Sequence, residues 1–164
     1  MSVQYFLKLQ GMEGESTDAR HRGEIEVEAW SWGETNSGGS AGGSGGGAGR
    51  VAMSDLRFTA RLGKASPKLL LACAAGQHIP SAVLVAQQSD EQRPAEDFLT
   101  LTLSDVLVKA YEAGDAGAAG AAPRDQVSLG FGRITIEYRP RSPDDGTLGP
   151  AVRSGWDLKA NRPA

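Results

Sequence analysis

The run EAWSWGETNSGGSAGGSGGGAGRVAMSD, residues 28–55, decides the fold of this 164-residue chain. Two tryptophans one residue apart precede a tract in which glycine is the commonest residue, and an alternating apolar pattern resumes after it. Too few residues precede the tract to bury a core of their own. We therefore interpret the tract as a long loop within one domain and not as a flexible linker between two domains.

The glycine tract does not have the spacing of a phosphate-binding loop. Such loops follow G-x-x-x-x-G-K-[ST], and dinucleotide sites follow G-x-G-x-x-G, each ahead of a helix whose N-terminus binds the anion. Neither spacing occurs here, and Arg50 after the tract leads into a strand-like segment. We predict no cofactor at this loop.

The two segments beside the tract, residues 24–32 and 50–62, show the alternation of strands. A one-residue slip after Ser54 indicates a bulge in the second. Opposite charges favour pairing of the two segments into a hairpin closed by the loop. Strict alternation in the first segment places Ile25, Val27, Ala29 and Ser31 on one face and Glu24, Glu26, Glu28, Trp30 and Trp32 on the other.

The rest of the chain is predicted to be mainly strands, at residues 3–9, 81–87, 98–108 and 126–139. Residues 104–113 could form a short helix, but the β-branched Val106 and Val108 favour a strand. One helix is expected after Ser66 as N-cap, with Pro67 at its first position and Gly76 as a left-handed stop. Its expected apolar stripe is Leu69, Leu70, Cys73 and Ala74. This pattern indicates one mainly β domain, a barrel or sandwich with a single helix.

Bulk composition excludes several function classes. A net charge of −3 and a pI near 5.4 give no general attraction to nucleic acid or anionic membranes. The apolar runs are too short for membrane insertion, and the N-terminus lacks the pattern of a secretory signal. The single cysteine, Cys73, excludes an intramolecular disulfide and fits a reducing cytosol.

Candidate chemistry is sparse. His21 and His78 lack neighbours at metal-ligand spacing and are interpreted as ordinary loop residues. Cys73 lies on the apolar stripe of the helix and is interpreted as core. Alternating glutamates usually form a solvated or ion-paired face. Trp30 and Trp32 fit a barrel core, although their expected position beside three glutamates favours an interface. We predict no catalytic, metal or cofactor site and no enzyme activity.

Five segments in order resemble one known family. They are GESTDARHRGEIEVEAWSWG, GGGAGRV, FTARLGKASPKLLLACAAGQHIPSAVL, LTLSDVLVKAY and GWDLKAN. Together they are similar to the haemolysin-coregulated proteins (Hcp), the tube subunits of type VI secretion systems. The chain departs from that pattern chiefly in the length of 34–47 and in the alanine-rich 113–122.

The resemblance implies a single domain over residues 1–164: an antiparallel β-barrel, one flanking α-helix, an extended loop at 34–49 and a tail at 140–164. It also implies homo-hexameric rings that stack into a tube, which a contractile sheath expels together with its VgrG-type spike. The baseplate and the sheath would be further partners of the subunit. Small effector proteins would travel in the lumen. The subunit would be cytoplasmic before firing and then secreted without a cleaved signal peptide.

Assembly residues follow from the resemblance and the strand pattern. Ser31 is expected on the lumen wall, in contact with effectors. The loop is expected to reach the next ring, and Trp156 to anchor the tail. The full set expected in ring or tube contacts is Glu24, Glu26, Glu28, Trp30, Trp32, Gly38, Gly39, Gly42, Gly43, Gly45, Gly46, Gly47, Arg50 and Trp156.

Two other functions remain open at this point. One is a tail tube protein of a phage or another contractile injection system, which would share the architecture. The other is a small hydrolase that uses His21 or Cys73, for which the sequence offers no partner residues.

Overall fold

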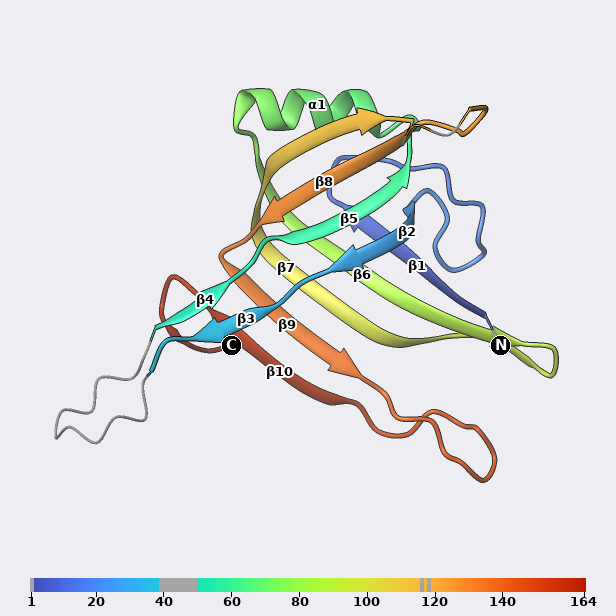
Figure 1. The fold of residues 1–164 in the computed structure, drawn as a ribbon. Helices are drawn as coiled ribbons and strands as arrows, with labels where there is room; N and C mark the ends of the chain where they lie inside the picture. Colours follow the sequence, from blue (N-terminus) through green and yellow to red (C-terminus); the bar gives the residue numbers. More distant parts are fainter. Residues whose placement is uncertain (1, 39–49, 116, 118) are drawn as a thin grey trace, which may run out of the picture.

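A computed structural model describes residues 2–38, 50–115, 117 and 119–164 (Figure 1). These residues form eleven strands and one helix. The elements are β1 (Ser2–Leu9), β2 (Ile25–Ser31), β3 (Glu34–Asn36), β4 (Val51–Met53), β5 (Leu56–Arg61), α1 (Ser66–Ala75), β6 (His78–Asp90), β7 (Arg93–Gly114), β8 (Arg124–Gly130), β9 (Arg133–Tyr138), β10 (Val152–Asp157) and β11 (Arg162–Pro163).

Six of these strands close an antiparallel barrel in the order β7-β6-β1-β2-β5-β8. Closure occurs because β7 pairs with β6 on one side and with β8 on the other. Helix α1 lies across one end of this barrel (Figure 1). The predicted mainly β fold with an antiparallel barrel and a flanking helix is confirmed.

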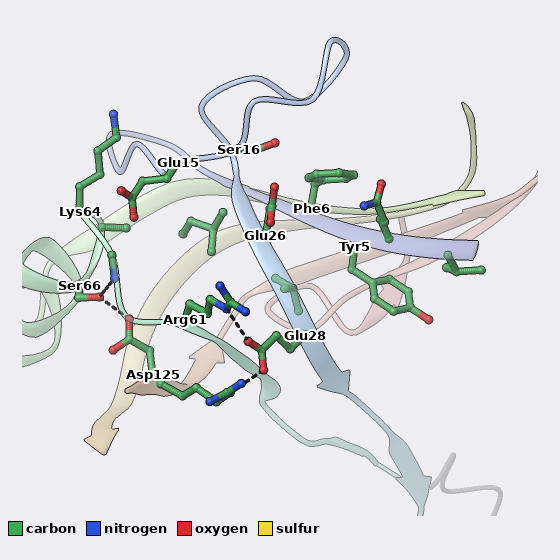
Figure 2. A pocket seen from close by; sticks show the side chains of 18 residues that line it. Tyr5, Phe6, Glu15, Ser16, Glu26, Glu28, Arg61, Lys64, Ser66 and Asp125 are labelled. Carbon is green, nitrogen blue, oxygen red and sulfur yellow. Dashed lines mark hydrogen bonds and ion pairs between the residues drawn. The ribbon is translucent and has the colours of Figure 1, made fainter. Parts of the chain in front are cut away.

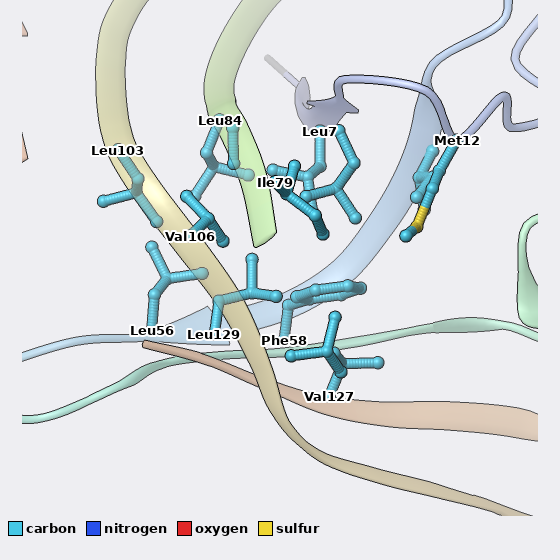
Figure 3. Packing of buried hydrophobic residues seen from close by; sticks show 14 of the residues in the cluster. Leu7, Met12, Leu56, Phe58, Ile79, Leu84, Leu103, Val106, Val127 and Leu129 are labelled. Atoms are coloured by element: carbon cyan, nitrogen blue, oxygen red, sulfur yellow. The ribbon is translucent and has the colours of Figure 1, made fainter. Parts of the chain in front are cut away.

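The barrel interior is filled by large apolar side chains. Leu56, Val106 and Leu129 have no exposed surface, and Figure 3 shows them gathered in one cluster with Phe58 and Leu103. Alternation along each strand sends one face inward, so each barrel strand contributes to a single cluster. The barrel therefore buries its own core without help from a second chain.

Strand β7 pairs with different strands along its two halves. Its residues Leu99–Ser104 pair with β9, and its residues Leu107–Gly114 pair with β8. Between them Asp105 adopts a left-handed backbone with φ of 54°, a conformation that aspartate tolerates better than most residues. Lys159 Nζ lies 2.7 Å from the Asp105 carboxylate and lowers its pKa, mainly through this hydrogen bond. On one side of this kink, β9, β10 and β11 continue the same nine-stranded sheet outside the barrel, and these three strands are here called the extension.

The segments on the two sides of the glycine tract pair as a hairpin, as predicted. Strand β2 pairs with β5, and β3 pairs with β4 in a separate ribbon. The expected bulge after Ser54 is wrong, because Ser54 lies in a break between β4 and β5 and bonds across to Gly33. Gly38 is exposed. The predictions on Gly39, Gly42, Gly43, Gly45, Gly46 and Gly47 lie outside the described residues.

The single helix is confirmed with two corrections. Gly76 ends it with φ of 61°, but the N-cap is Ala65 rather than Ser66. The Ser66 hydroxyl instead donates to the buried Asp125 carboxylate. Leu69 faces the core as expected, whereas Leu70 is 56% exposed, so the predicted stripe is only partly correct.

Strand lengths also differ from the prediction. The segment 126–139 is two strands, because the chain turns at Phe131 and Gly132 between β8 and β9. Part of the tail adds β10 and β11 to the sheet. The preference for a strand over a helix at 104–113 is confirmed, since these residues belong to β7.

Candidate functional site: an assembly surface

The extension carries apolar side chains on a surface that no described residue covers. Val152 is 65% exposed, Tyr138 47% and Ile136 38%. Val152 lies opposite Tyr138, and Ser154 lies opposite Ile136, in the pairing of β9 with β10. Directly paired residues share one face of a sheet, so the three side chains form a continuous patch, here called the extension face.

A groove continues from the extension face toward the β3–β4 ribbon. It has a volume of about 620 Å³ and is lined by both sheets, including Trp32, Met53, Ile136 and Trp156. The indole Nε1 groups of Trp32 and Trp156 are buried and have no hydrogen-bond partner among the described residues. A buried donor without a partner costs roughly 1–3 kcal/mol. Because these two nitrogens have almost no exposed surface, a partner in the groove would meet mainly the apolar parts of its lining.

A bulge in β2 changes the orientation of the tryptophans. The register with β5 shifts between Val27 and Ala29, so the strict alternation that placed Trp30 and Trp32 beside the glutamates is wrong. Both tryptophans pack against the barrel core, and Trp30 meets Tyr5 edge to face at a centroid distance of 6.1 Å. The barrel-core interpretation holds for them, with Trp32 also reaching the groove.

The three glutamates of the first hairpin strand have different surroundings. Glu28 accepts a hydrogen bond from Arg124 Nε at 2.7 Å and lies 3.7 Å from Arg61 (Figure 2). Glu24 contacts the buried His21. Glu26 is exposed and makes no ion pair with any described residue. Only Glu26 therefore keeps its full charge available to a partner.

Figure 2 also shows a buried carboxylate, Asp125, beside the start of α1. Asp125 is 2% exposed and accepts hydrogen bonds from Ser66 Oγ and from Tyr111 Oη, the latter at 2.8 Å. Burial and this bond raise the pKa of the Tyr111 hydroxyl. Both hydroxyls donate to the same carboxylate, so the group fastens α1 to β7 and β8. In the sequence, the only indication of this cluster was an aspartate within an alternating segment, and we did not predict the cluster from it.

Ser31 lies on a different surface. It is exposed and pairs with Arg57, which in turn pairs with Ser128, so these residues form a row across three strands. The concavity around them measures about 750 Å³ and also contains Thr59 and Gln126. Ser31 does face away from Trp30, but the bulge separates it from the inward face of Ile25 that it was expected to share. We call this surface the polar face.

The other candidate residues are His21, Cys73 and Arg50. His21 is 6% exposed and contacts two carboxylates, so its interpretation as an ordinary loop residue is wrong. Cys73 is half-buried against the core, and Arg50 is exposed. In the described part of the chain, no three side chains are arranged to hold a metal ion. Within the same residues, no helix has the length and apolarity to cross a membrane.

Comparison with known proteins gives the family. Residues 6–138 match the sequence model described as type VI secretion system effector, Hcp. The chain belongs to the Hcp family. Protein hcp1 of Pseudomonas aeruginosa is 37% identical over 161 residues, which covers 98% of each chain. The resemblance noted in the sequence is thus confirmed.

Solved Hcp structures share the whole fold. Hcp1 of Salmonella typhimurium aligns over 100% of both chains with 29% identity and a TM-score of 0.78. A structure described as a type six secretion system protein covers 99% of this chain and 100% of its own, with 28% identity and a TM-score of 0.89. Hcp proteins are secreted tube proteins of type VI secretion systems and form a structural family, not an enzyme family.

Proposed function

We propose that this Hcp-family chain is a non-catalytic subunit of the inner tube, in which six copies close a ring and rings stack inside a contractile sheath. Sheath contraction expels the tube with its spike from the cytoplasm. The lumen carries small effector proteins. The observation that carries this proposal is the extension face, which no described residue covers, beside a groove lined by Trp32 and Trp156.

The extension needs a neighbour for two reasons. Exposed apolar patches on this scale mark interaction surfaces. In addition, β10 pairs with β11 only at Trp156 and Asp157, so among the described strands none covers the outer edge of β10 from Val152 to Ser154. Open strand edges promote uncontrolled pairing unless they are covered. A head-to-tail contact that closes into a ring buries both features in every subunit.

The decisive test changes the extension face. The double variant Ile136→Asp, Val152→Asp places charges on this face and should convert the ring to a folded monomer in light scattering coupled to size exclusion. The matched control is Leu70→Asp, Leu71→Asp on α1, because those side chains are 56% and 60% exposed and lie elsewhere. Rings that survive the first variant, or a wild-type monomer at high concentration, would refute the proposal.

Glu26 is proposed to form an ion pair between subunits, since it has no ion-pair partner among the described residues. Glu26→Lys should weaken the ring in a size-exclusion dilution series. Glu28→Lys is not a clean comparison because Glu28 binds Arg124, so Glu26→Gln serves as the milder control. Unchanged ring stability in Glu26→Lys would remove Glu26 from the interface.

The glycine tract and Arg50 are proposed to contact the adjacent ring. Fixing a backbone residue costs roughly 1–2 kcal/mol, so stacking of free rings should require high concentration or a template. Deletion of residues 38–47 should leave rings intact and abolish tubes in electron micrographs. Tubes of normal length from the deletion variant would contradict this role.

The polar face is proposed to line the lumen, with Ser31 in contact with effectors. Small polar side chains suit a wall that accepts different proteins. Ser31→Gln should reduce effector recovery in a pull-down, whereas Ser89→Gln, at the distant end of β6, should not. Equal recovery with both variants would place the cargo elsewhere.

A further inference from the structure

His21 occupies an unusual position for a residue between two strands. It lies in the segment 10–24 that joins β1 to β2, here called the β1–β2 connection, and it is only 6% exposed. Its ring stacks on Phe6 of β1, with 4.5 Å between centroids and 11° between planes. The ring is thus held in the protein and cannot turn freely toward water.

Both ring nitrogens face carboxylates. Nδ1 contacts Glu24 of the same connection, and Nε2 lies 2.9 Å from Oδ1 of Asp97 in β7. Asp18 is the third charged group nearby, and its carboxylate accepts the backbone N–H of His21 at 3.1 Å. The strand β1 contributes the uncharged Phe6, and β6 contributes the amide of Gln87, which donates to Asp18 at 3.5 Å.

This arrangement requires a protonated ring. Neutral imidazole has one donor and one acceptor, whereas ionised carboxylates only accept hydrogen bonds. Both contacts exist together only when both ring nitrogens carry hydrogen. Burial alone would lower the pKa of His21, but the hydrogen bond to Asp97 and the charges of Glu24 and Asp97 outweigh it and raise the pKa.

A bulge in the β6–β7 hairpin lies beside the residues that contact the β1–β2 connection. The register shifts between Ala86 and Gln87, and Gln87 then lies opposite Asp97. Paired residues share one face of the sheet, so both side chains reach the connection, with Gln87 only 2% exposed and Asp97 partly exposed at the rim. Near Gln87 and Asp97, the connection is held to this hairpin through Asp18 and His21. At the other end of the connection, Gln10 accepts a hydrogen bond from Ser81 of β6.

Residues 14–24 of the connection are held mainly to one another, whereas its first residues, Gln10 and Gly11, bond to β6 and α1. Gly14 N–H donates to the Gly23 carbonyl at 2.8 Å, and Ser16 N–H donates to the Glu24 carbonyl at 3.0 Å. Gly14 and Ser16 also line the groove of Figure 2, close to Glu26. A movement of the connection would therefore change one wall of that groove.

We propose that protonated His21 holds residues 14–24 of the β1–β2 connection against the β6–β7 hairpin, and that these residues detach from the hairpin when the ring loses its proton. The attachment is complete below the pH at which a free histidine titrates, about 6.5, and is lost as the pH rises through the higher value of the folded protein. The connection is thus a pH-sensitive part of an otherwise rigid barrel.

The test follows the ring and the connection separately in the intact protein. Proton NMR should show His21 titrating above pH 6.5. Amide-exchange protection factors of residues 14–24, corrected for intrinsic rates, should fall at least tenfold between pH 6 and pH 9, while amides of β5 and β8 stay protected. His21→Gln should show the low protection at both pH values. His78→Gln, at an exposed histidine beside Asp105, should retain the wild-type fall.

Asp97→Asn provides a second variant, because Asp97 is about one-third exposed at the rim and its replacement preserves side-chain shape. It should shift the midpoint of the His21 titration to lower pH. The proposal is overturned if wild-type His21 titrates at or below pH 6.5, if protection of residues 14–24 is constant from pH 6 to pH 9, or if His21→Gln keeps the pH-dependent fall. If His21→Gln does not fold, the His21 titration in the wild-type protein and its shift in Asp97→Asn still test the proposal.

Discussion

The barrel and the extension are built from the same kind of alternating strand, yet they treat large apolar side chains in opposite ways. In the barrel, Leu56 and Leu129 have no exposed surface. In the extension, Val152 and Tyr138 expose about half or more of theirs. The two regions share strand β7, so this difference does not arise from separate domains.

The comparison shows that sheet closure, and not composition, decides which apolar residues are buried. A closed sheet covers its inward face with its own opposite wall. The extension does not close on itself and so has no opposite wall. Its apolar side chains therefore stay exposed until another surface covers them. The barrel should therefore determine whether the subunit folds, and the extension should determine whether subunits associate.

The strongest test of this contrast removes barrel volume. Leu129→Ala deletes a fully buried side chain and should lower the unfolding free energy by about 2–5 kcal/mol, because it loses apolar burial and leaves a cavity. Urea denaturation at one fixed, dilute protein concentration measures this change. Val152→Ala, at a 65% exposed site, is the matched control and should change it by less than about 0.5 kcal/mol. Similar losses of unfolding free energy in the two variants would show that the barrel and the extension do not differ in their contribution to folding.

A second test disrupts the extension alone. A Cβ at Gly155 would lie 2.7 Å from the carbonyl oxygen of Ile134 and equally close to Thr135 Cγ2. Gly155→Val should therefore cost about 1–3 kcal/mol, confined to the pairing of β9 with β10. Amide exchange should accelerate in those strands and stay slow in β5. Gly33→Val, where a Cβ meets nothing within 4 Å, is the control. Faster exchange throughout the barrel would show that the two regions unfold as one unit.

The smallest expected effect lies on the polar surface of the barrel. Glu28→Gln removes the charge that Arg124 and Arg61 share, and these side chains are partly exposed. Exposed ion pairs contribute about 0.2–1 kcal/mol, and salt screens them. Thermal melts at low and high salt should show a small loss only at low salt. Glu26→Gln should show none in the isolated subunit, and a larger effect there would reveal an unrecognised partner.

Much of the fold was predictable from local pattern. Pro67 and Gly76 bracket the helix because their backbone preferences act on single residues. The hairpin across the glycine tract was predictable because the segments on both sides alternate and carry opposite charges. Val106 and Val108 correctly favoured a strand, since β-branched side chains fit a pleated sheet.

What failed depended on register or on distant contacts. Alternation could not reveal the bulge after Val27, since either phase places apolar residues inward, Ala29 in one and Trp30 in the other. Ser66 looked like a cap because its other partner, Asp125, is 59 residues away. His21 depends in the same way on Asp97, at a separation of 76 residues. The exposure of Ile136 and Val152 follows from the missing opposite wall, which no local pattern records.

The kink of β7 at Asp105 has a mechanical consequence. One continuous backbone carries the hydrogen-bond ladder to β9 on one side of the kink and the ladder to β8 on the other. A pull that drags the extension along the direction of β7 loads many of these bonds at once in shear. A pull across the strand would open them one after another, which needs far less force. The subunit should therefore resist axial load much better than peeling, and single-molecule pulling along these two directions would measure the difference.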